Sequence, residues 1–171
     1  EKKAQERSIE WLQADMRVLD DVPTTDAVTL FSDSLCYLTD FEDVVSVFEA
    51  VYDHLEEGGI FLFDVHSLYQ MQEVFPGYQY HFVEDDFAFL WQSYELDEPG
   101  SVEHVIDMYI KQEDGNLYEH YQEVHEEQTF PIEMYEAALE MVGFTNIKVK
   151  ADFGQSEAQE TSPRWFFQAV K

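Results

Sequence analysis

The chain has 171 residues, of which 45% are hydrophobic and 16% aromatic, so it can bury a full core and we expect one soluble domain. Thirty-seven acidic residues against nine basic ones give a formal charge of −28. This charge repels a phosphate backbone, so nucleic acid is not an expected partner.

The apolar runs, the N-terminal residues and the cysteine content bear on the cellular compartment. No apolar run approaches the ~18 residues of a membrane span, and no signal peptide is visible, so we expect no membrane contact. The single cysteine, Cys36, excludes an internal disulfide and fits a reducing compartment. The expected location is therefore the cytoplasm, with Cys36 as an inert buried thiol.

The chain opens with EKKAQERS, which has the composition of the charged end of a helix and does not start with Met. We therefore expect that an upstream part of the natural protein precedes it. Residues 9–14, IEWLQA, predict a short strand that ends at Asp15 and Met16.

Residues 26–38, DAVTLFSDSLCYL, combine an apolar run with a sudden polar end. The run with Val28 and Leu30 predicts a strand buried on both faces. Asp33 lies just past its carboxyl end, where open α/β sheets bind their ligands. The alternative is that Asp33 is a turn residue that bonds its own backbone.

A helix and a second strand follow. The residues TDFE at 39–42 have the form of a capping box, in which the Thr39 hydroxyl and the Glu42 carboxylate bond free amides. Apolar residues at helical spacing continue to Leu55, and Gly58 is the expected C-terminal cap. Residues 59–65, GIFLFDV, predict another buried strand, so that the three elements form one parallel crossover.

The pattern then changes to alternation broken by turn signals. Residues 87–96, 102–110 and 117–128 predict a three-stranded antiparallel meander. A helix runs from Pro131 to Gly143, and residues 146–151 and 165–170 predict a closing hairpin.

Histidines and acids are frequent in the meander. The run EHYQEVHEEQ at 119–128 is typical of the solvated face of an edge strand. His104, His120 and His125 lie among carboxylates, but strand alternation points His120 and His125 to opposite faces. We therefore expect no metal site there.

Four stretches in order carry a family resemblance: WLQADMR at 11–17, DAVTLFSDSLCYL at 26–38, LEEGGIFLFDVHS at 55–67 and MVGFTNIKV at 141–149. The chain resembles a class I S-adenosylmethionine-dependent methyltransferase, most closely a bacterial branch of that family. The resemblance implies a Rossmann-like, mostly parallel α/β sheet with residues 78–128 inserted as an antiparallel lid. The family's Gly-rich loop and ribose-binding acid have no counterpart here, so the resemblance places them upstream with the first two strands.

The resemblance also implies a site and a reaction. S-adenosylmethionine would be the cofactor, with Asp15 near its adenine and Met16 beside the ring. The loop of Ser32, Asp33 and Ser34 would line the cofactor and the substrate.

The expected reaction is methyl transfer to a small-molecule acceptor. Asp64 and His66 leave their strand on the crevice side and could orient or deprotonate that acceptor. Equally, Asp64 and Ser67 could only cap the helix that follows.

Two alternatives to methyl transfer remain at this point. The fold could serve as a non-catalytic acidic module that binds a basic protein, or as an oxidoreductase with a nucleotide cofactor. Without the first two strands, the apolar edge of residues 26–31 would be open, which favours strand exchange with a second copy and thus a possible homodimer.

Overall fold

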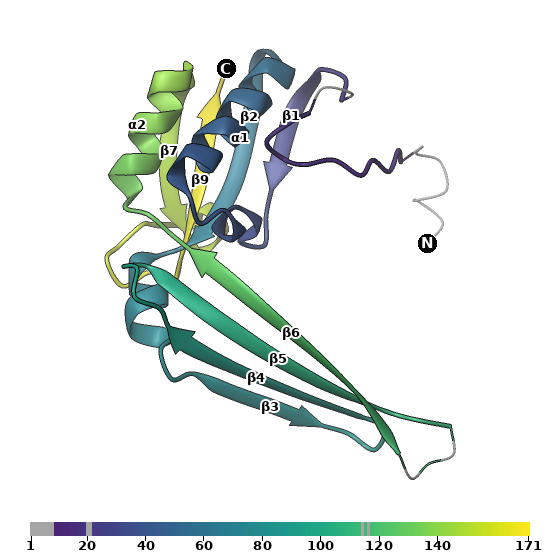
Figure 1. Cartoon of the computed structure of the whole chain (residues 1–171). Helices are drawn as coiled ribbons and strands as arrows, with labels where there is room; N and C mark the ends of the chain where they lie inside the picture. The colour runs from purple at the N-terminus through teal and green to yellow at the C-terminus, as the bar shows by residue number, and fades with distance from the viewer. Residues whose placement is uncertain (1–8, 20–21, 114, 116) are drawn as a thin grey trace.

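The computed structural model describes residues 9–19, 22–113, 115 and 117–171. Two sheets make up the chain, a five-stranded one in the order β1-β2-β9-β7-β8 and a four-stranded one in the order β3-β4-β5-β6 (Figure 1). The strands of the first sheet are β1 (Thr25–Leu30), β2 (Leu55–His66), β7 (Thr145–Ala151), β8 (Ser156–Glu157) and β9 (Arg164–Val170). Those of the second are β3 (Gln79–Val83), β4 (Phe87–Glu95), β5 (Ser101–Lys111) and β6 (Tyr118–Gln128).

The first sheet mixes parallel and antiparallel pairs. β1 runs parallel to β2, and α1 (Phe41–His54) connects them, as the crossover pattern predicts. β9 then inserts antiparallel between β2 and β7, so the predicted closing hairpin is confirmed. Within the described residues only β1 and β2 are parallel, so the expectation of a mostly parallel sheet is wrong for this chain. The reason is that the strands after the crossover return as hairpins.

β1 lies at an edge of this sheet. Val28 and Leu30 are only half-buried and Phe31 is 46% exposed, so the expected burial on both faces is wrong. The cause is that, in the described part of the chain, only β2 pairs with β1. Residues 9–14 likewise form no strand, and Trp11 is 87% exposed, because no strand in the described part of the chain pairs with them.

The start of α1 differs from the predicted capping box. Asp40, not Thr39, is the N-cap, and its carboxylate accepts a hydrogen bond from the Glu42 amide at 3.0 Å. The helix ends at His54, so Gly58 is no cap but lies inside β2 with a φ of 79°.

Replacing Asp40 with alanine should therefore lower the free energy of unfolding by about 1 kcal/mol, because the first turn of α1 loses its side-chain acceptor. Urea denaturation monitored by circular dichroism measures the change. Thr39→Ala is the matched control and should leave the midpoint where it is. An equal loss in both variants would contradict Asp40 as the cap.

Both long helices, α1 and α2 (Ile132–Val142), cover the same face of the first sheet (Figure 1). In β2, Phe63 points to this face and contacts Phe48 of α1 and Tyr135 of α2. Because side chains alternate along a strand, Asp64 and its even-numbered neighbours point to the opposite face. This alternation separates the apolar core from the polar site described below.

The second sheet extends away from the first as a long ribbon (Figure 1). It has four strands, not the three predicted, because β3 pairs antiparallel with β4. Burial is concentrated where the ribbon meets the first sheet, at Val102, His104 and Glu127. At the far end Leu117 and Tyr118 are exposed.

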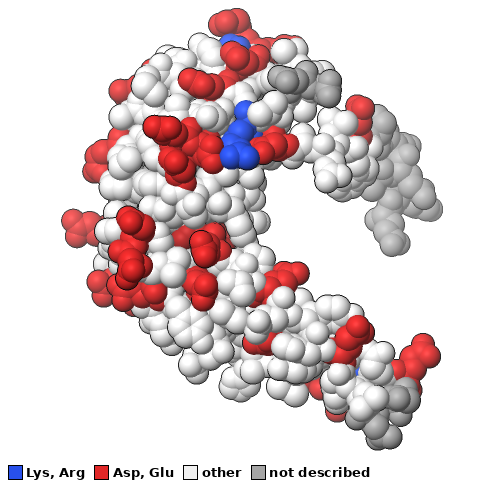
Figure 2. All heavy atoms as spheres, viewed as in Figure 1, with Lys and Arg blue, Asp and Glu red and all other residues white. Residues whose placement is uncertain are grey.

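Acidic side chains are spread over both parts of the molecule on the face shown in Figure 2, with few basic ones among them. This distribution matches the formal charge of −28. None of the helices in the described residues is long and apolar enough to span a membrane.

Candidate active site

The turn after β1 directs Asp33 toward the end of β2. Ser32 and Asp33 both adopt left-handed backbone conformations, with φ of 63° and 51°. The Ser34 hydroxyl donates to the Phe31 carbonyl at 2.8 Å, and the Cys36 amide donates to the Asp33 carbonyl at 2.7 Å. The turn is thus closed by other groups, which leaves the Asp33 carboxylate available for contacts across the sheet.

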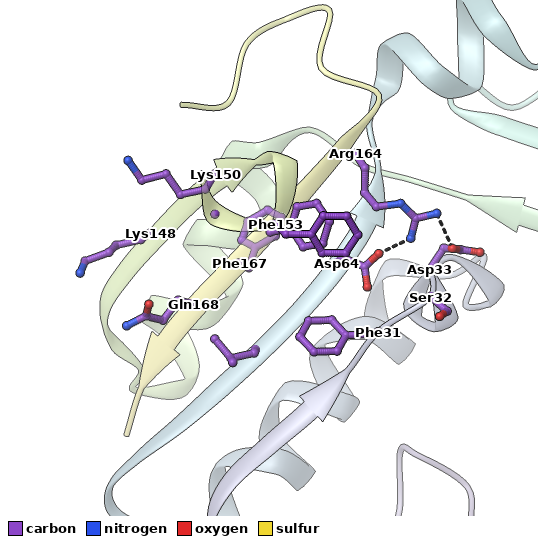
Figure 3. Close-up of a pocket in the computed structure, with 13 residues that line it drawn as sticks. Phe31, Ser32, Asp33, Asp64, Lys148, Lys150, Phe153, Arg164, Phe167 and Gln168 are labelled. Atoms are coloured by element: carbon purple, nitrogen blue, oxygen red, sulfur yellow. Dashed lines mark hydrogen bonds and ion pairs between the residues drawn. The ribbon is translucent and has the colours of Figure 1, made fainter. Parts of the chain in front are cut away.

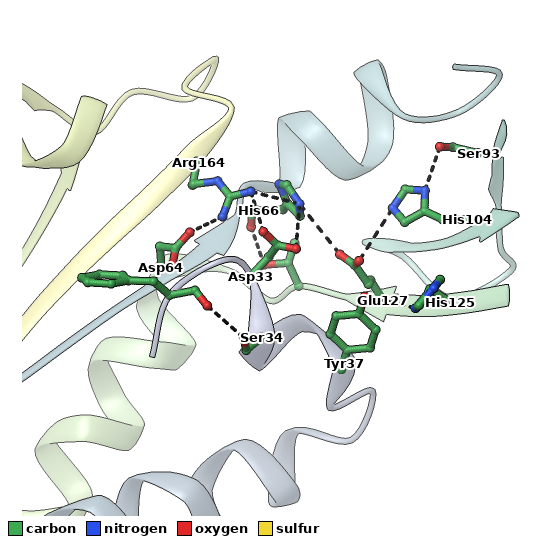
Figure 4. Close-up of polar contacts among 12 residues, drawn as sticks. Asp33, Ser34, Tyr37, Asp64, His66, Ser93, His104, His125, Glu127 and Arg164 are labelled. Atoms are coloured by element: carbon green, nitrogen blue, oxygen red, sulfur yellow. Dashed lines mark hydrogen bonds and ion pairs between the residues drawn. The ribbon is translucent and has the colours of Figure 1, made fainter. Parts of the chain in front are cut away.

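Arg164 at the start of β9 joins the two strand ends (Figures 3 and 4). It pairs with His66 across the β2–β9 ladder, which brings its guanidinium to the edge of the sheet. Its Nη2 lies 2.6 Å from Asp33 Oδ1, and its Nη1 donates to Asp64 Oδ2. Asp64 is 2% exposed, so this ion pair is largely removed from water.

The charged groups around Arg164 shift the pKa of a neighbouring carboxyl group. Burial by itself would raise the pKa of Asp33, but His66 and Arg164 outweigh it and lower that pKa to about 2. Asp64 binds the Arg164 guanidinium, so it serves as an ion-pair partner and does not cap a helix. Ser67 does: its hydroxyl accepts a hydrogen bond from the Gln70 amide at 3.0 Å.

A second set of contacts runs from His66 into the meander (Figure 4). His66 Nε2 lies 3.6 Å from Asp33 Oδ2 and 3.8 Å from Glu127 Oε2. Glu127 is only 4% exposed, and its Oε2 has no hydrogen-bond partner among the described residues. Burial and the nearby charge of Asp33 raise the pKa of Glu127 to about 7, against the opposing effect of Arg164.

His104 closes the network on the other side of Glu127. Trp91 Nε1 is a donor only, and it donates to His104 Nδ1 at 3.1 Å. The proton of the neutral ring is therefore on Nε2, which faces Glu127 Oε1 at 4.0 Å. Burial and the charges of His66 and His125 lower the pKa of His104 to about 4, so this ring stays neutral near pH 7.

The site opens into two hollows. The larger, of about 770 Å³, lies on the sheet face opposite the helices and is lined by aromatic residues such as Phe31 and Phe153 and by Lys148 (Figure 3). The smaller, of about 270 Å³, lies where the meander meets the first sheet. Asp33 and Arg164 line both hollows and so stand between them.

A metal ion is the first ligand to consider for such a cluster. Asp33, His66 and Glu127 each offer one ligand atom, and these atoms lie within 4.8 Å of one another. However, Arg164 Nη2 is 3.4 Å from the same His66 Nε2. Because arginine only donates, it directs a proton at the lone pair by which His66 would bind an ion, so the donor set does not favour a metal.

Asp15 and Met16 precede β1 in the chain, and their contacts are separate from those of Arg164. Arg17 holds both oxygens of the Asp15 carboxylate and also bonds Asp43 in the first turn of α1 at 2.7 Å. Because α1 begins shortly after the turn that carries Asp33, this bond places Asp15 near the carboxyl end of β1. Met16 packs partly buried against the core. No contact joins Asp15 to Ser32, Asp33 or Ser34 in the described structure.

Two residues of the network, Arg164 and Glu127, were not predicted as site residues, and His104 was considered only as a metal ligand. Arg164 carried a usable signal, because it is one of only nine basic residues and directly precedes an apolar strand. Glu127 carried none, since it lies in the run of 119–128, in which the residues before His125 are exposed as predicted.

Known proteins are similar to this chain over almost its whole length. A protein of Bacillus subtilis (strain 168) named "Putative methyltransferase YqeM" is 37% identical over 172 residues, which cover all of this chain and 69% of that protein. A protein of Geobacillus sp. (strain WCH70) with the same kind of name is also 37% identical, over 99% of this chain and 68% of its own length. The chain belongs to the class I S-adenosylmethionine-dependent methyltransferases.

Solved structures agree with this methyltransferase fold. The crystal structure of an S-adenosylmethionine-dependent methyltransferase from Clostridium acetobutylicum ATCC 824 superposes with a TM-score of 0.86 at 24% identity, over 98% of this chain and 67% of that one. The sugar N-methyltransferase KedS8 from Streptoalloteichus sp. ATCC 53650 gives 0.72 at 23% identity, over 93% and 61%. No protein-family model matches this methyltransferase.

Proposed function

We propose that this methyltransferase transfers the methyl group of S-adenosylmethionine to a small-molecule acceptor bound in the 270 Å³ hollow. The observation that carries the proposal is the position of this hollow, at the carboxyl ends of β1 and β2, where Asp33 and His66 enter it. A hollow of this size fits a small molecule and not a macromolecular chain.

The cofactor side would be formed by Asp15, Met16, Ser32, Asp33 and Ser34. The fit rests on charge: bound S-adenosylmethionine supplies a methyl group already activated by a positive sulfonium, and the carboxyl end of β1 is acidic. Asp64 adds a buried Oδ1 that has no hydrogen-bond partner among the described residues. Such an edge favours a cationic ligand.

The acceptor side is lined by residues of both sheets. His66 orients the acceptor, and Asp64 positions Arg164, which also lines the hollow. Trp91, Phe89 and Ile106 of the meander line it as well. The meander is thus proposed as the lid, because closing it over the acceptor would exclude water from the reacting groups.

The similar folds support a small acceptor. One solved structure with a TM-score of 0.69 is an amino pentose methyltransferase, and KedS8 acts on a sugar nitrogen. These likenesses support an acceptor of similar size for this chain.

Calorimetric titration of the natural full-length protein, which includes the segment expected to carry the Gly-rich loop, with S-adenosylhomocysteine tests the cofactor half of the proposal. Asp15→Ala should weaken binding about three- to tenfold, because one hydrogen bond to the adenine amine is lost. Asp26→Ala, an exposed acid at the opposite end of β1, is the control and should bind like the wild type. Equal affinity in all three proteins would remove Asp15 from the site, and no binding to the wild type would contradict the proposed function.

A further inference from the structure

The buried carboxylate of Glu127 faces the acceptor hollow with one oxygen unused. The side chain is 4% exposed and lines the 270 Å³ hollow. His104 presents its Nε2 proton toward Oε1, whereas Oε2 has no hydrogen-bond partner among the described residues. A buried oxygen without a partner costs stability, so its retention at this position points to a ligand.

The charges around the hollow favour a cationic ligand. Among the described residues, Arg164 is the only Lys or Arg that lines it, and its guanidinium is already shared between Asp33 and Asp64. Asp33 and Glu127 line the hollow together with Arg164, and Asp64 pairs with Arg164 from outside it, so with Glu127 ionised the carboxylates outnumber the guanidinium. An acceptor that carries a carboxylate or phosphate would be repelled, and a neutral hydroxyl would leave the excess charge uncompensated.

The walls of the hollow suit the same ligand. Tyr37, Phe89 and Trp91 line it, and the faces of aromatic rings attract an ammonium group by a cation–π interaction. Trp91 is fixed in place by its hydrogen bond to His104. The hollow therefore combines a carboxylate with aromatic surfaces, which is an arrangement suited to a protonated amine.

We infer that the methyl acceptor is an amine and that Glu127 both binds its ammonium form and removes its proton. This inference rests on the proposed methyl transfer. In the proton step an N–H bond of the ammonium breaks, its electron pair stays on nitrogen, and the proton forms an O–H bond at Glu127 Oε2. The neutral amine then has the lone pair that a methyl acceptor needs, and Glu127 later releases the proton to solvent.

Glu127 fits this role better than His104 and Asp33. A base works best when its pKa is close to the working pH, and Glu127 has a pKa of about 7. His104 cannot accept the proton, because Trp91 occupies its Nδ1 and its Nε2 already carries a hydrogen. Asp33 is held ionised by Arg164 and has a pKa of about 2, which makes it a weak base.

Three probes that share a cyclohexyl ring and differ in charge test the inference by calorimetry on the full-length protein at pH 8: cyclohexylamine, cyclohexanol and cyclohexanecarboxylate. The wild-type chain should bind cyclohexylamine about tenfold or more tightly than cyclohexanol, and the carboxylate least. Glu127→Gln should abolish the preference for the amine, because the amide keeps the shape and loses the charge. The preference should also fall between pH 8 and pH 6, as Glu127 becomes protonated.

Glu126→Gln is the matched control, since Glu126 is the exposed neighbour on β6 and its loss should leave the preference intact. Equal binding of the three probes, no binding of any probe at millimolar concentration, or a preference that survives in Glu127→Gln would each overturn the inference. Titration with S-adenosylhomocysteine on the same proteins separates the two proposals. Intact cofactor binding without charge selection refutes the amine alone, whereas loss of cofactor binding in the wild type refutes the methyl transfer.

Discussion

Replacing Arg164 with methionine should lower the free energy of unfolding at pH 7 by about 3 kcal/mol, because two carboxylates lose their shared cation. Asp64 is 2% exposed and Asp33 is half-buried, so neither regains full hydration in the variant. The value lies at the lower end for a broken buried ion pair, since Arg164 itself is partly exposed. Urea denaturation followed by tryptophan fluorescence measures the change.

The pH dependence separates this effect from a loss of packing. His66 and Arg164 together lower the pKa of Asp33 to about 2 from its usual value near 4, so the stabilisation that Arg164 contributes is complete above pH 4 and is lost between pH 4 and pH 2. The difference between wild type and Arg164→Met should therefore shrink over that range. Arg17→Met, which breaks an exposed pair with Asp15, is the control and should change stability little at any pH. A loss that stays constant down to pH 2 would contradict the electrostatic explanation.

Replacing Glu127 with glutamine should stabilise the chain above pH 7 by about 3 kcal/mol relative to its effect at pH 4.5. The folded state raises the pKa of Glu127 to about 7, so the folded chain binds its proton more tightly than the unfolded chain does. The wild type consequently loses stability as the pH rises from about 4.5 to 7, and the penalty is complete above that. Glutamine has the same shape and never ionises, so the variant escapes the penalty.

Unfolding curves at pH 4.5, 6 and 8 test this expectation. Glu126→Gln, one residue earlier on the same strand and exposed, should follow the wild type at all three values. A Glu127→Gln variant that is less stable than the wild type at pH 8 would show that the ionised carboxylate has a stabilising partner and would refute its placement as an unpaired group. Gained stability combined with lost amine selection would mark Glu127 as a residue kept at a cost to the fold.

Local pattern predicted the elements that need no distant partner. The spacing of apolar residues predicted α1 and the order of strands and helices around it, because an amphipathic period is written in consecutive residues. The turn signals DEPGS and EDGN likewise separated β4, β5 and β6, although β3 was missed. Four short stretches at the right distances were enough to indicate the family, and the polar end of β1 indicated Asp33 as a site residue.

Partners remote in sequence decided the rest. Residues 9–14 have the composition of a strand, but a strand forms only where a neighbour accepts its backbone hydrogen bonds, and the described residues offer none. The environment of Glu127 depends on the antiparallel ladder that brings β6 back to the end of β2, and nothing in its exposed neighbours marks it as buried. Arg164 reaches Asp64 across a separation of 100 residues. The sequence alone thus determined the family and the acidic strand end, whereas the charge balance of the acceptor hollow arose only from tertiary contacts, because pKa and pairing depend on which groups the fold brings together.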